Sequence, residues 1–194
     1  MDVETMFWRR LDRPGHEAAR LVFHPPFWQL TGTAVFADAG VPCRVEYQIT
    51  CDAAWQTLAA QLSGWIGPRR MVCAISADAR RRWRLDGQAC PEVEGCVDLD
   101  LSFSPATNLL PIRRLGLVTG GEASVRAAWL RFPDLRLEPL AQHYRRLAAE
   151  RYGYEAGAPG AAFRAELRVA PSGFVLECPG LWVRESCDRP GETA

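Results

Sequence analysis

The stretch from Glu94 to Leu117 constrains the fold most strongly, because in it a strand pattern passes directly into a helix pattern. Its first half alternates strictly: Val97, Leu99, Leu101 and Phe103 are apolar, and the residues between them are small or acidic. A period of two places these two sets on opposite faces of a β-strand. The sequence therefore predicts a strand with one apolar face and one polar face.

The strand pattern ends at the segment SPATN, whose residues favour turns and helix caps, and the apolar segment LLPIRRL follows. With Asn108 as the N-cap, Pro111 falls in the first helical turn, where the N–H that proline lacks has no intrahelical partner. Gly116 then occupies the position of a left-handed C-cap, and Arg113 and Arg114 lie where cations complement the helix dipole. A short apolar helix that directly follows a strand is expected to pack against, or inside, a curved sheet.

Short alternating segments separated by turns recur along the rest of the chain. The segment from Cys43 to Thr50 shows the pattern clearly, with Val45, Tyr47 and Ile49 expected to face inward. A further hairpin is predicted at 80–93, around an Asp-Gly turn. We therefore predict a mainly β protein that forms a single domain over all 194 residues.

Composition and charge exclude several classes of function. The formal net charge is zero and all 23 basic residues are arginine, so the surplus of positive charge that general nucleic-acid binding needs is missing. The N-terminal sequence lacks a secretory pattern, and the longest uncharged run, 21–37, is broken by two prolines and polar residues. We therefore expect a cytoplasmic protein with no nucleic-acid partner and no membrane span. The tail from about residue 189 is expected to be disordered.

The chain has seven cysteines, and no two of them have CxxC spacing. A structural zinc site needs paired short spacings with further cysteine or histidine. We therefore expect reduced, mostly buried thiols, no metal and no cofactor.

Several motifs occur in order along nearly the whole chain. The central ones are GCVDLDL and SPATNLLPIRRL; the others are WRRLDRPGHE at 8–17, Gly-x-Pro at 40–42, Asp52 with Trp55, WRLDG at 83–87, Gln142-x-Tyr144 and CPGLWVR at 178–184. Together they resemble the putative glycolipid-binding family of bacteria. The sequence departs from that pattern at Cys178, where a tyrosine is expected, so any role of that ring is absent here.

The resemblance implies a long antiparallel sheet curled as a β-roll around a single α-helix. It also implies a homodimer, a glycolipid ligand and distant similarity to periplasmic lipoprotein-carrier folds. Because fold alone does not determine function, the ligand is the weakest of these implications.

The resemblance also bears on two ambiguous segments, 52–67 and 140–151. Local propensity favours a helix in both segments, since alanine, leucine and tyrosine recur at helical spacing. The resemblance favours a strand in both. We predict a strand in the first segment and leave the second open, because propensity is a weak guide in a sheet-dominated protein. The first strand is expected to carry on one face Trp55, Thr57, Ala59 and Gln61.

Asp98-Leu99-Asp100 has the form of a DxD motif, with two carboxylates on one strand face roughly 7 Å apart. Such a pair could hold a divalent metal or perform acid–base chemistry. The alternative is structural, with the carboxylates accepting hydrogen bonds from Arg113, Arg114 or neighbouring arginines. We favour a structural or head-group-binding network, because the nucleotide-binding fold that accompanies DxD in glycosyltransferases is missing.

Thr107 and Asn108 are most simply turn and cap residues, but with Arg113 they could also bind a polar head group. His16 and Glu17 are adjacent, and a carboxylate beside an imidazole can position a general base. Neighbours in a strand point to opposite faces, however, so these two side chains cannot easily act together. We favour a structural role for them.

Two further sets of residues could have either a binding role or a structural role. Trp28, Trp83 and Trp129 could stack on sugar rings, although burial in the core is the more frequent fate of tryptophan. Alternate arginines beside Trp83 could bind anionic head groups or form a solvated outer face, which we favour. They are Arg80, Arg82 and Arg84.

The function we expect is non-catalytic binding of an amphipathic ligand, such as a glycolipid, between the inner sheet face and the helix. The tail is expected along inward residues such as Val97, Leu99, Leu101 and Leu109, and the polar head at Asp98, Asp100, Asn108 and Arg113. One alternative is an enzyme that acts on a sugar or lipid ester through Asp98 and Asp100, with His16 and Glu17 across the roll. Another is a dimeric interaction protein with no ligand and a filled core. The candidate ligand-binding residues are Asp98, Asp100, Thr107, Asn108, Arg113, Arg114, His16, Glu17 and Trp83.

Overall fold

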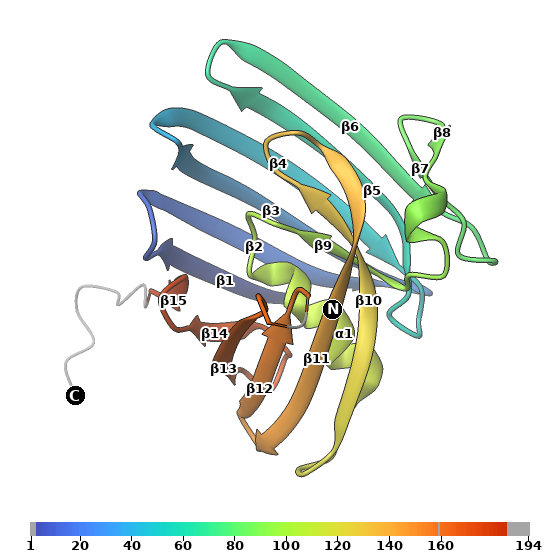
Figure 1. Cartoon of the computed structure of the whole chain (residues 1–194), viewed down its shortest axis with the longest axis vertical. Coiled ribbons are helices and arrows are strands. Elements are labelled where there is room, and N and C mark those ends of the chain that lie inside the picture. Colours follow the sequence, from blue (N-terminus) through green and yellow to red (C-terminus); the bar gives the residue numbers. More distant parts are fainter. Residues whose placement is uncertain (1–2, 159, 186–194) are drawn as a thin grey trace.

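The computed structural model describes residues 3–158 and 160–185. They form one sheet of fifteen strands, in the order β8-β7-β6-β5-β4-β3-β2-β1-β15-β14-β13-β12-β11-β10-β9. The sheet is not closed, and it curls around the single helix α1 (Figure 1). The prediction of a mainly β protein with a long sheet rolled around one helix is confirmed. The expected disordered tail from about residue 189 lies outside the described residues.

The first eight strands are β1 (Val3–Arg10), β2 (Gly15–His24), β3 (Phe27–Asp38), β4 (Val41–Cys51), β5 (Thr57–Ile66), β6 (Arg69–Ala77), β7 (Trp83–Leu85) and β8 (Gln88–Ala89). The remaining strands are β9 (Asp98–Leu101), β10 (Glu122–Arg131), β11 (Arg136–Ala148), β12 (Arg151–Ala156), β13 (Phe163–Val169), β14 (Val175–Cys178) and β15 (Trp182–Arg184). The helical elements are the 3₁₀ turns η1 (Pro91–Val93) and η2 (Ala106–Asn108) and the helix α1 (Leu109–Leu115).

All neighbouring strands are antiparallel except β9 and β10, which are parallel. The helix α1 lies between them in the chain and provides the crossover that a parallel pair requires. The predicted separation into an apolar and an acidic face is present in β9, but both faces are largely covered, and only Asp100 of the acidic face is half-buried rather than buried. Asp98 and Leu99, on opposite faces, are both at most 1% exposed. The strand lies inside the roll, so the alternation separates an apolar core from a buried polar layer.

The helix α1 begins at Leu109, so Asn108 occupies the predicted N-cap position. It has helical backbone angles, however, and its side chain makes no capping hydrogen bond. The turn η2 precedes the helix, and the Ser104 hydroxyl accepts a hydrogen bond from the Ala106 amide. The C-terminal prediction is confirmed, since Gly116 has a left-handed φ of 52°. No helix in the described part of the chain is long and apolar enough to cross a membrane.

Both ambiguous segments form strands, β5 and β11. The strand prediction for the first is confirmed, but its predicted face is wrong. Thr57 and Trp55 are buried, whereas Gln61 is exposed. A bulge causes the change: Thr50 pairs with Ala59 while the next residue of β4 pairs with Thr57, so the side-chain phase shifts between them.

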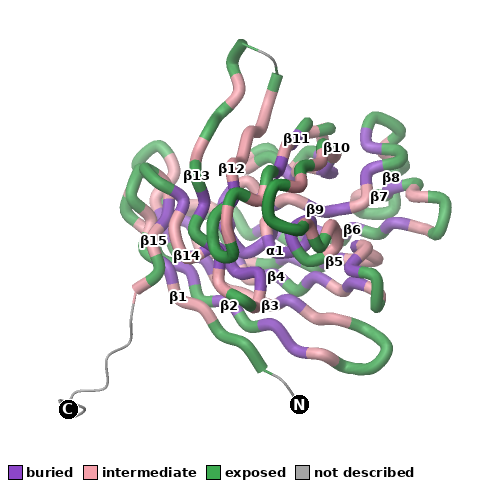
Figure 2. The backbone as a smooth tube through the Cα atoms, turned by 90° about the horizontal axis from the view of Figure 1, so that it is seen from below, coloured by how far each residue is buried: buried purple, intermediate pink, exposed green. Residues whose placement is uncertain are grey.

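The inner faces of the strands and the apolar face of α1 form one core. Val45, Tyr47 and Ile49 are buried as predicted, and Leu109 and Leu110 of the helix are at most 1% exposed. Figure 2 shows the buried residues gathered around α1 and along the inner faces, with the exposed residues in the outer loops. The space between the helix and the long strands is therefore occupied by side chains.

The described cysteines are all free thiols, in agreement with the expected reduced state. Five are buried: Cys43, Cys51, Cys73, Cys96 and Cys178. Burial raises the pKa of Cys51 and Cys73 to about 12, which keeps these thiols protonated and unreactive at neutral pH.

Strand β9 meets the start of β5, so two distant parts of the strand order lie side by side. The Thr57 amide donates to the Val97 carbonyl at 3.3 Å, and the Thr57 hydroxyl accepts from the Leu99 amide at 3.1 Å. The roll is thus bridged here by single hydrogen bonds and without a continuous ladder.

Arg81 holds this junction together. Its guanidinium donates to three carbonyls, those of Thr57 at 2.8 Å, Val97 at 2.7 Å and Cys96 at 3.1 Å. The Trp83 indole donates to the same Cys96 carbonyl at 2.9 Å. The planar fork of arginine suits such a role, because its donors reach several acceptors in one plane.

Candidate functional site

A cluster of five polar side chains lies where β9, the start of the helix, β11 and β12 meet. The Gln142 side-chain nitrogen donates to Asp100 Oδ2 at 2.7 Å and to the Tyr154 hydroxyl at 3.1 Å. The Asn108 amide donates to the Tyr144 hydroxyl at 2.9 Å, and that hydroxyl donates to Gln142 Oε1 at 3.4 Å. The five groups form one connected network, of which sequence reasoning had selected only Asp100 and Asn108.

Strand register brings these residues together. Tyr144 lies opposite Tyr154, with ring centroids 4.9 Å apart, and Gln142 lies two residues from Tyr144 on the same face of β11. On β10, Trp129 lies opposite Asp100. Cross-strand partners share a face, so Asp100, Gln142, Tyr144 and Tyr154 belong to one face of this part of the sheet, and Asn108 reaches the same face from η2.

Burial sets the protonation states in the cluster. Desolvation raises the pKa of Asp100 to about 6, although the hydrogen bond from Gln142 opposes the shift. Asp100 is therefore mainly ionised at neutral pH. Desolvation also raises the pKa of Tyr144 and Tyr154, so both phenols remain hydrogen-bond donors.

The cluster borders a pocket of about 360 Å³ within the roll. Its apolar wall is formed by Leu101, Pro105, Trp129, Leu140, Ala156, Phe163, Leu181 and Trp182. Its polar wall is formed by Asp100, Ser102, Ser104, Asn108 and Tyr154. An apolar pocket with a few converging polar groups is the usual form of a small-molecule site.

Asp98, the second carboxylate of the DxD motif, has a different partner. Its two oxygens accept from Arg114, with Nε to Oδ1 at 2.9 Å and a second guanidinium nitrogen to Oδ2 at 2.5 Å. Asp98 is 1% exposed and the Arg114 side chain 19% exposed. This bidentate pair agrees with the structural interpretation of the motif for Asp98, while Asp100 alone of the two borders the pocket.

The adjacent residues His16 and Glu17 point to opposite faces of β2. Glu17 is buried, and its Oε1 accepts from the hydroxyls of Tyr47 and Ser104, both at 2.6 Å, while Oε2 has no hydrogen-bond partner among the described residues. Desolvation raises the pKa of Glu17 to about 7. His16 is exposed and lies 3.3 Å from the Glu185 carboxylate. The arrangement needed for joint acid–base chemistry with the DxD motif is thus not formed.

The other predicted candidates lie outside the polar cluster. Thr107 is buried, and its hydroxyl accepts from the Leu101 amide at 3.2 Å, which is a turn-stabilising role. Arg113 is exposed, with its guanidinium carbon 4.9 Å from the ring centre of Trp55. Trp83 is 1% exposed, so neither ring face is available for stacking on a sugar.

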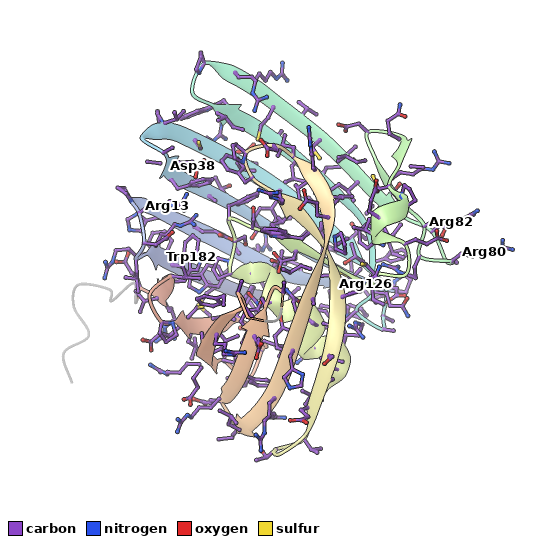
Figure 3. All side chains as sticks on the ribbon, in the orientation of Figure 1. Arg13, Asp38, Arg80, Arg82, Arg126 and Trp182 are labelled. Atoms are coloured by element: carbon purple, nitrogen blue, oxygen red, sulfur yellow. The ribbon has the colours of Figure 1, made fainter. Side chains whose placement is uncertain are left out.

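The predicted arginine stripe lies at the rim of the molecule. Arg80, Arg82 and Arg84 are exposed, and Arg82 pairs with Asp78 at 2.6 Å. Figure 3 shows Arg80 and Arg82 at the opposite edge of the molecule from Trp182, which lines the pocket. The stripe therefore does not contribute to the pocket.

A larger hollow of about 910 Å³ lies over β1–β4. Its exposed lining residues, Ala18 and Arg20 among them, belong to the outward-facing sets of their strands. Tyr47 lines it and hydrogen-bonds the buried Glu17, but no residue of the polar cluster lines it. We therefore regard the inner pocket as the candidate site. The outer hollow serves as the control position for substitutions that test this site.

Sequence reasoning missed Gln142, Tyr144, Tyr154 and Trp182 as site residues. Two of them carried a signal, since the spacing in Gln142-x-Tyr144 places both side chains on one strand face. Trp182 lies within the CPGLWVR motif, but nothing in the motif indicates a pocket. Tyr154 carried no signal, because its place depends on its register with β11.

Comparisons with known proteins agree with this architecture. Residues 5–184 match the model of a family described as "Putative glycolipid-binding". The chain is similar to the crystal structure of a DUF1089 family protein from Pseudomonas aeruginosa, at 35% sequence identity and a TM-score of 0.76, with 88% of this chain and 92% of that chain covered. No curated protein matches the chain. Because the family model covers nearly the whole sequence, the chain belongs to the putative glycolipid-binding family.

Proposed function

We propose that the protein binds an amphipathic ligand, a glycolipid, in the pocket between β9, the start of the helix and the C-terminal strands, and that it acts as a binding protein rather than an enzyme. The observation that carries the proposal is the joint presence of an apolar wall and a connected polar network in one pocket of about 360 Å³. The apolar wall suits an alkyl chain, and the polar wall suits a head group.

The pocket lies elsewhere than the binding position that the sequence predicts. The tail was expected along Val97, Leu99, Leu101 and Leu109. Leu99 and Leu109 are fully buried in the core, and of the four residues only Leu101 borders the pocket. The head was expected at Asp98 and Arg113 as well as Asp100. Only Asp100 and Asn108, of the residues expected to bind the head, border the pocket.

A binding role also fits the state of the carboxylates. Asp98 is held by Arg114, and Glu17 is buried behind Ser104 and Tyr47. A general acid–base pair needs two groups that reach one reacting atom. Asp100 is the one carboxylate among the described lining residues, and a single carboxylate with an amide and phenols is better suited to holding a polar group.

The test is a titration with octyl β-D-glucoside below its critical micelle concentration. Binding is detected by isothermal titration calorimetry and by the change in tryptophan fluorescence. Ala156 lines the pocket, so Ala156→Phe should fill it and weaken binding at least about tenfold. Ala18 lines the outer hollow, so Ala18→Phe is the matched control and should leave affinity within about twofold. Binding that is lost in Ala18→Phe and kept in Ala156→Phe would assign the ligand to the outer hollow and contradict the proposal.

The homodimer and the cytoplasmic location stay predictions from the sequence and the resemblance. Light scattering coupled to size-exclusion chromatography tests the first: a mass of twice 21.6 kDa is expected. A monomer at all accessible concentrations would contradict it. Fractionation of the native host tests the second.

A further inference from the structure

The described charged side chains that line the pocket are acidic only. Asp100 is the one acidic side chain among the described lining residues, and no arginine or histidine lines the pocket. The two arginines of the helix are engaged elsewhere, Arg114 with Asp98 and Arg113 over Trp55. Two more guanidinium groups lie over tryptophan rings of the wall, Arg10 over Trp182 and Arg131 over Trp129, and each is paired with a carboxylate, that of Asp12 or Glu138. An anionic head group would therefore lose hydration, face the Asp100 carboxylate and find no cation among the described lining residues.

The polar wall also offers unused hydrogen-bonding positions. Gln142 donates to Oδ2 of Asp100, and no described residue donates to Oδ1. The Tyr154 hydroxyl accepts from the same Gln142 nitrogen, which leaves its own proton to donate. Because one nitrogen contacts both groups, the free acceptor and the free donor lie close together at the wall.

A neighbouring donor and acceptor match the chemistry of an alcohol. A hydroxyl group donates one hydrogen bond and accepts others, whereas a phosphate or carboxylate only accepts. Trp129 is half-buried and adds an indole ring to the same pocket, where such a ring packs well against the apolar face of a sugar or against an alkyl chain. Trp182 is buried, with the Arg10 guanidinium over its ring, and contributes only to the apolar wall.

We infer that the pocket selects amphiphiles with an uncharged, hydroxyl-bearing sugar head and rejects those with a phosphate or carboxylate head. The inference rests on the proposed function and adds the class of ligand to it. In the complex, Asp100 Oδ1 accepts from a sugar hydroxyl and the Tyr154 hydroxyl donates to a sugar oxygen. The alkyl chain lies along the apolar wall.

The first experiment compares three probes that share one octyl chain: octyl β-D-glucoside, octyl phosphate and octylammonium, each titrated as monomers by calorimetry. Affinity for the glucoside should exceed that for the phosphate at least about tenfold. Equal or tighter binding of octyl phosphate, lost in Ala156→Phe, overturns the inference and leaves the proposed function standing. Tightest binding of octylammonium overturns it too, since the site then selects cations. Absence of binding by all three overturns the proposed function as well.

The second experiment uses Asp100→Asn, which keeps an oxygen for Gln142 and removes the charge. The ratio of glucoside to phosphate affinity should fall about tenfold. Asp134→Asn, on an exposed turn residue, is the control and should leave the ratio unchanged. An unchanged ratio in folded Asp100→Asn overturns the inference.

Tyr154→Phe keeps the test decisive if Asp100→Asn fails to fold. Loss of the phenolic donor should weaken glucoside binding several-fold to about tenfold and leave octyl phosphate binding, already weak, unaffected. Circular dichroism checks that each variant is folded. Glucoside affinity equal to that of the unaltered protein overturns the assigned role of the Tyr154 hydroxyl and, with it, the inference.

Discussion

Asp98 and Arg114 join the strand before the helix to the last turn of the helix through a bidentate ion pair, with Arg114 Nε 2.9 Å from Asp98 Oδ1. The pair closes the β9–α1 segment on itself, and Asp98 is 1% exposed. The two aspartates of the DxD motif therefore have different roles. Asp98 holds the helix through Arg114, and Asp100 borders the pocket.

Asp98→Asn should therefore destabilise the protein, because it leaves the partly buried Arg114 charge without its counter-ion. We expect a loss of about 3 kcal/mol in the free energy of unfolding, measured in urea. Glu166→Gln is the control: Glu166 pairs with Arg151 on the surface at 2.5 Å, and its removal should cost less than about 1 kcal/mol. A change of similar size in both variants would contradict the structural role of Asp98.

Arg81→Lys tests the junction between β9 and β5. Lysine keeps the charge but cannot reach three carbonyls in one plane, so at least one buried acceptor loses its partner. We expect a loss of about 2–3 kcal/mol and faster hydrogen exchange of the Leu99 amide. The exposed neighbour Arg80 provides the control, since Arg80→Lys should change neither quantity. Unchanged exchange at Leu99 in Arg81→Lys would show that the junction does not depend on the guanidinium.

Thr57→Val isolates one hydrogen bond of the same junction. Valine preserves shape and removes the oxygen that accepts from the Leu99 amide, so a buried donor is left unpaired. The expected loss of stability is about 1–3 kcal/mol. Thr33→Val, on the half-buried outer side of β3, should be nearly neutral. Comparable effects of the two substitutions would argue against a specific contribution from Thr57.

Glu17 should make the protein more stable in mild acid than at alkaline pH. Burial raises its pKa from 4.5 to about 7, so the folded state binds a proton that the unfolded state has released between these values. The stabilising contribution is present below about pH 4.5 and is lost as the pH rises through 7, by roughly 3 kcal/mol in total. Asp100, with its pKa raised to about 6, contributes in the same direction.

The measurement is the free energy of unfolding from pH 5 to pH 8 in the unaltered protein and in Glu17→Gln. The variant has no titrating group at this position, so its stability should fall less over that range. Glu166→Gln, which removes an exposed carboxylate, should follow the unaltered protein. Parallel curves for Glu17→Gln and the unaltered protein would exclude the buried carboxyl as the source of the dependence.

Local sequence patterns predicted the features that depend only on residues close together in the chain. The alternation in β4 predicts which of its side chains are buried, and Gly116 marks the helix end because few other residues adopt its φ of 52°. The position of Asn108 before the helix was predicted in the same way, but the absence of its capping hydrogen bond was not. A 3₁₀ turn that is held by Ser104 precedes the helix, so the backbone of Asn108 is already helical.

The site depends on contacts between distant residues. Asp100 and Gln142 are 42 residues apart, and their hydrogen bond requires the register of β9, β10 and β11 to be known together. Arg81 lies in a run of three arginines that looks uniformly basic in sequence, and its role depends on carbonyls from two other segments. Such arrangements follow from topology, which the periodicity of a single chain does not specify.

The most direct test of the central claim is a crystal structure of the protein with 8-bromooctyl β-D-glucoside, in which the anomalous signal of bromine locates the alkyl chain. We predict a bromine peak along the apolar wall beside Trp129 and Phe163, with the sugar next to Asp100 and Tyr154. A peak in the outer hollow beside Ala18, or no peak at a saturating concentration of the probe, would contradict the account.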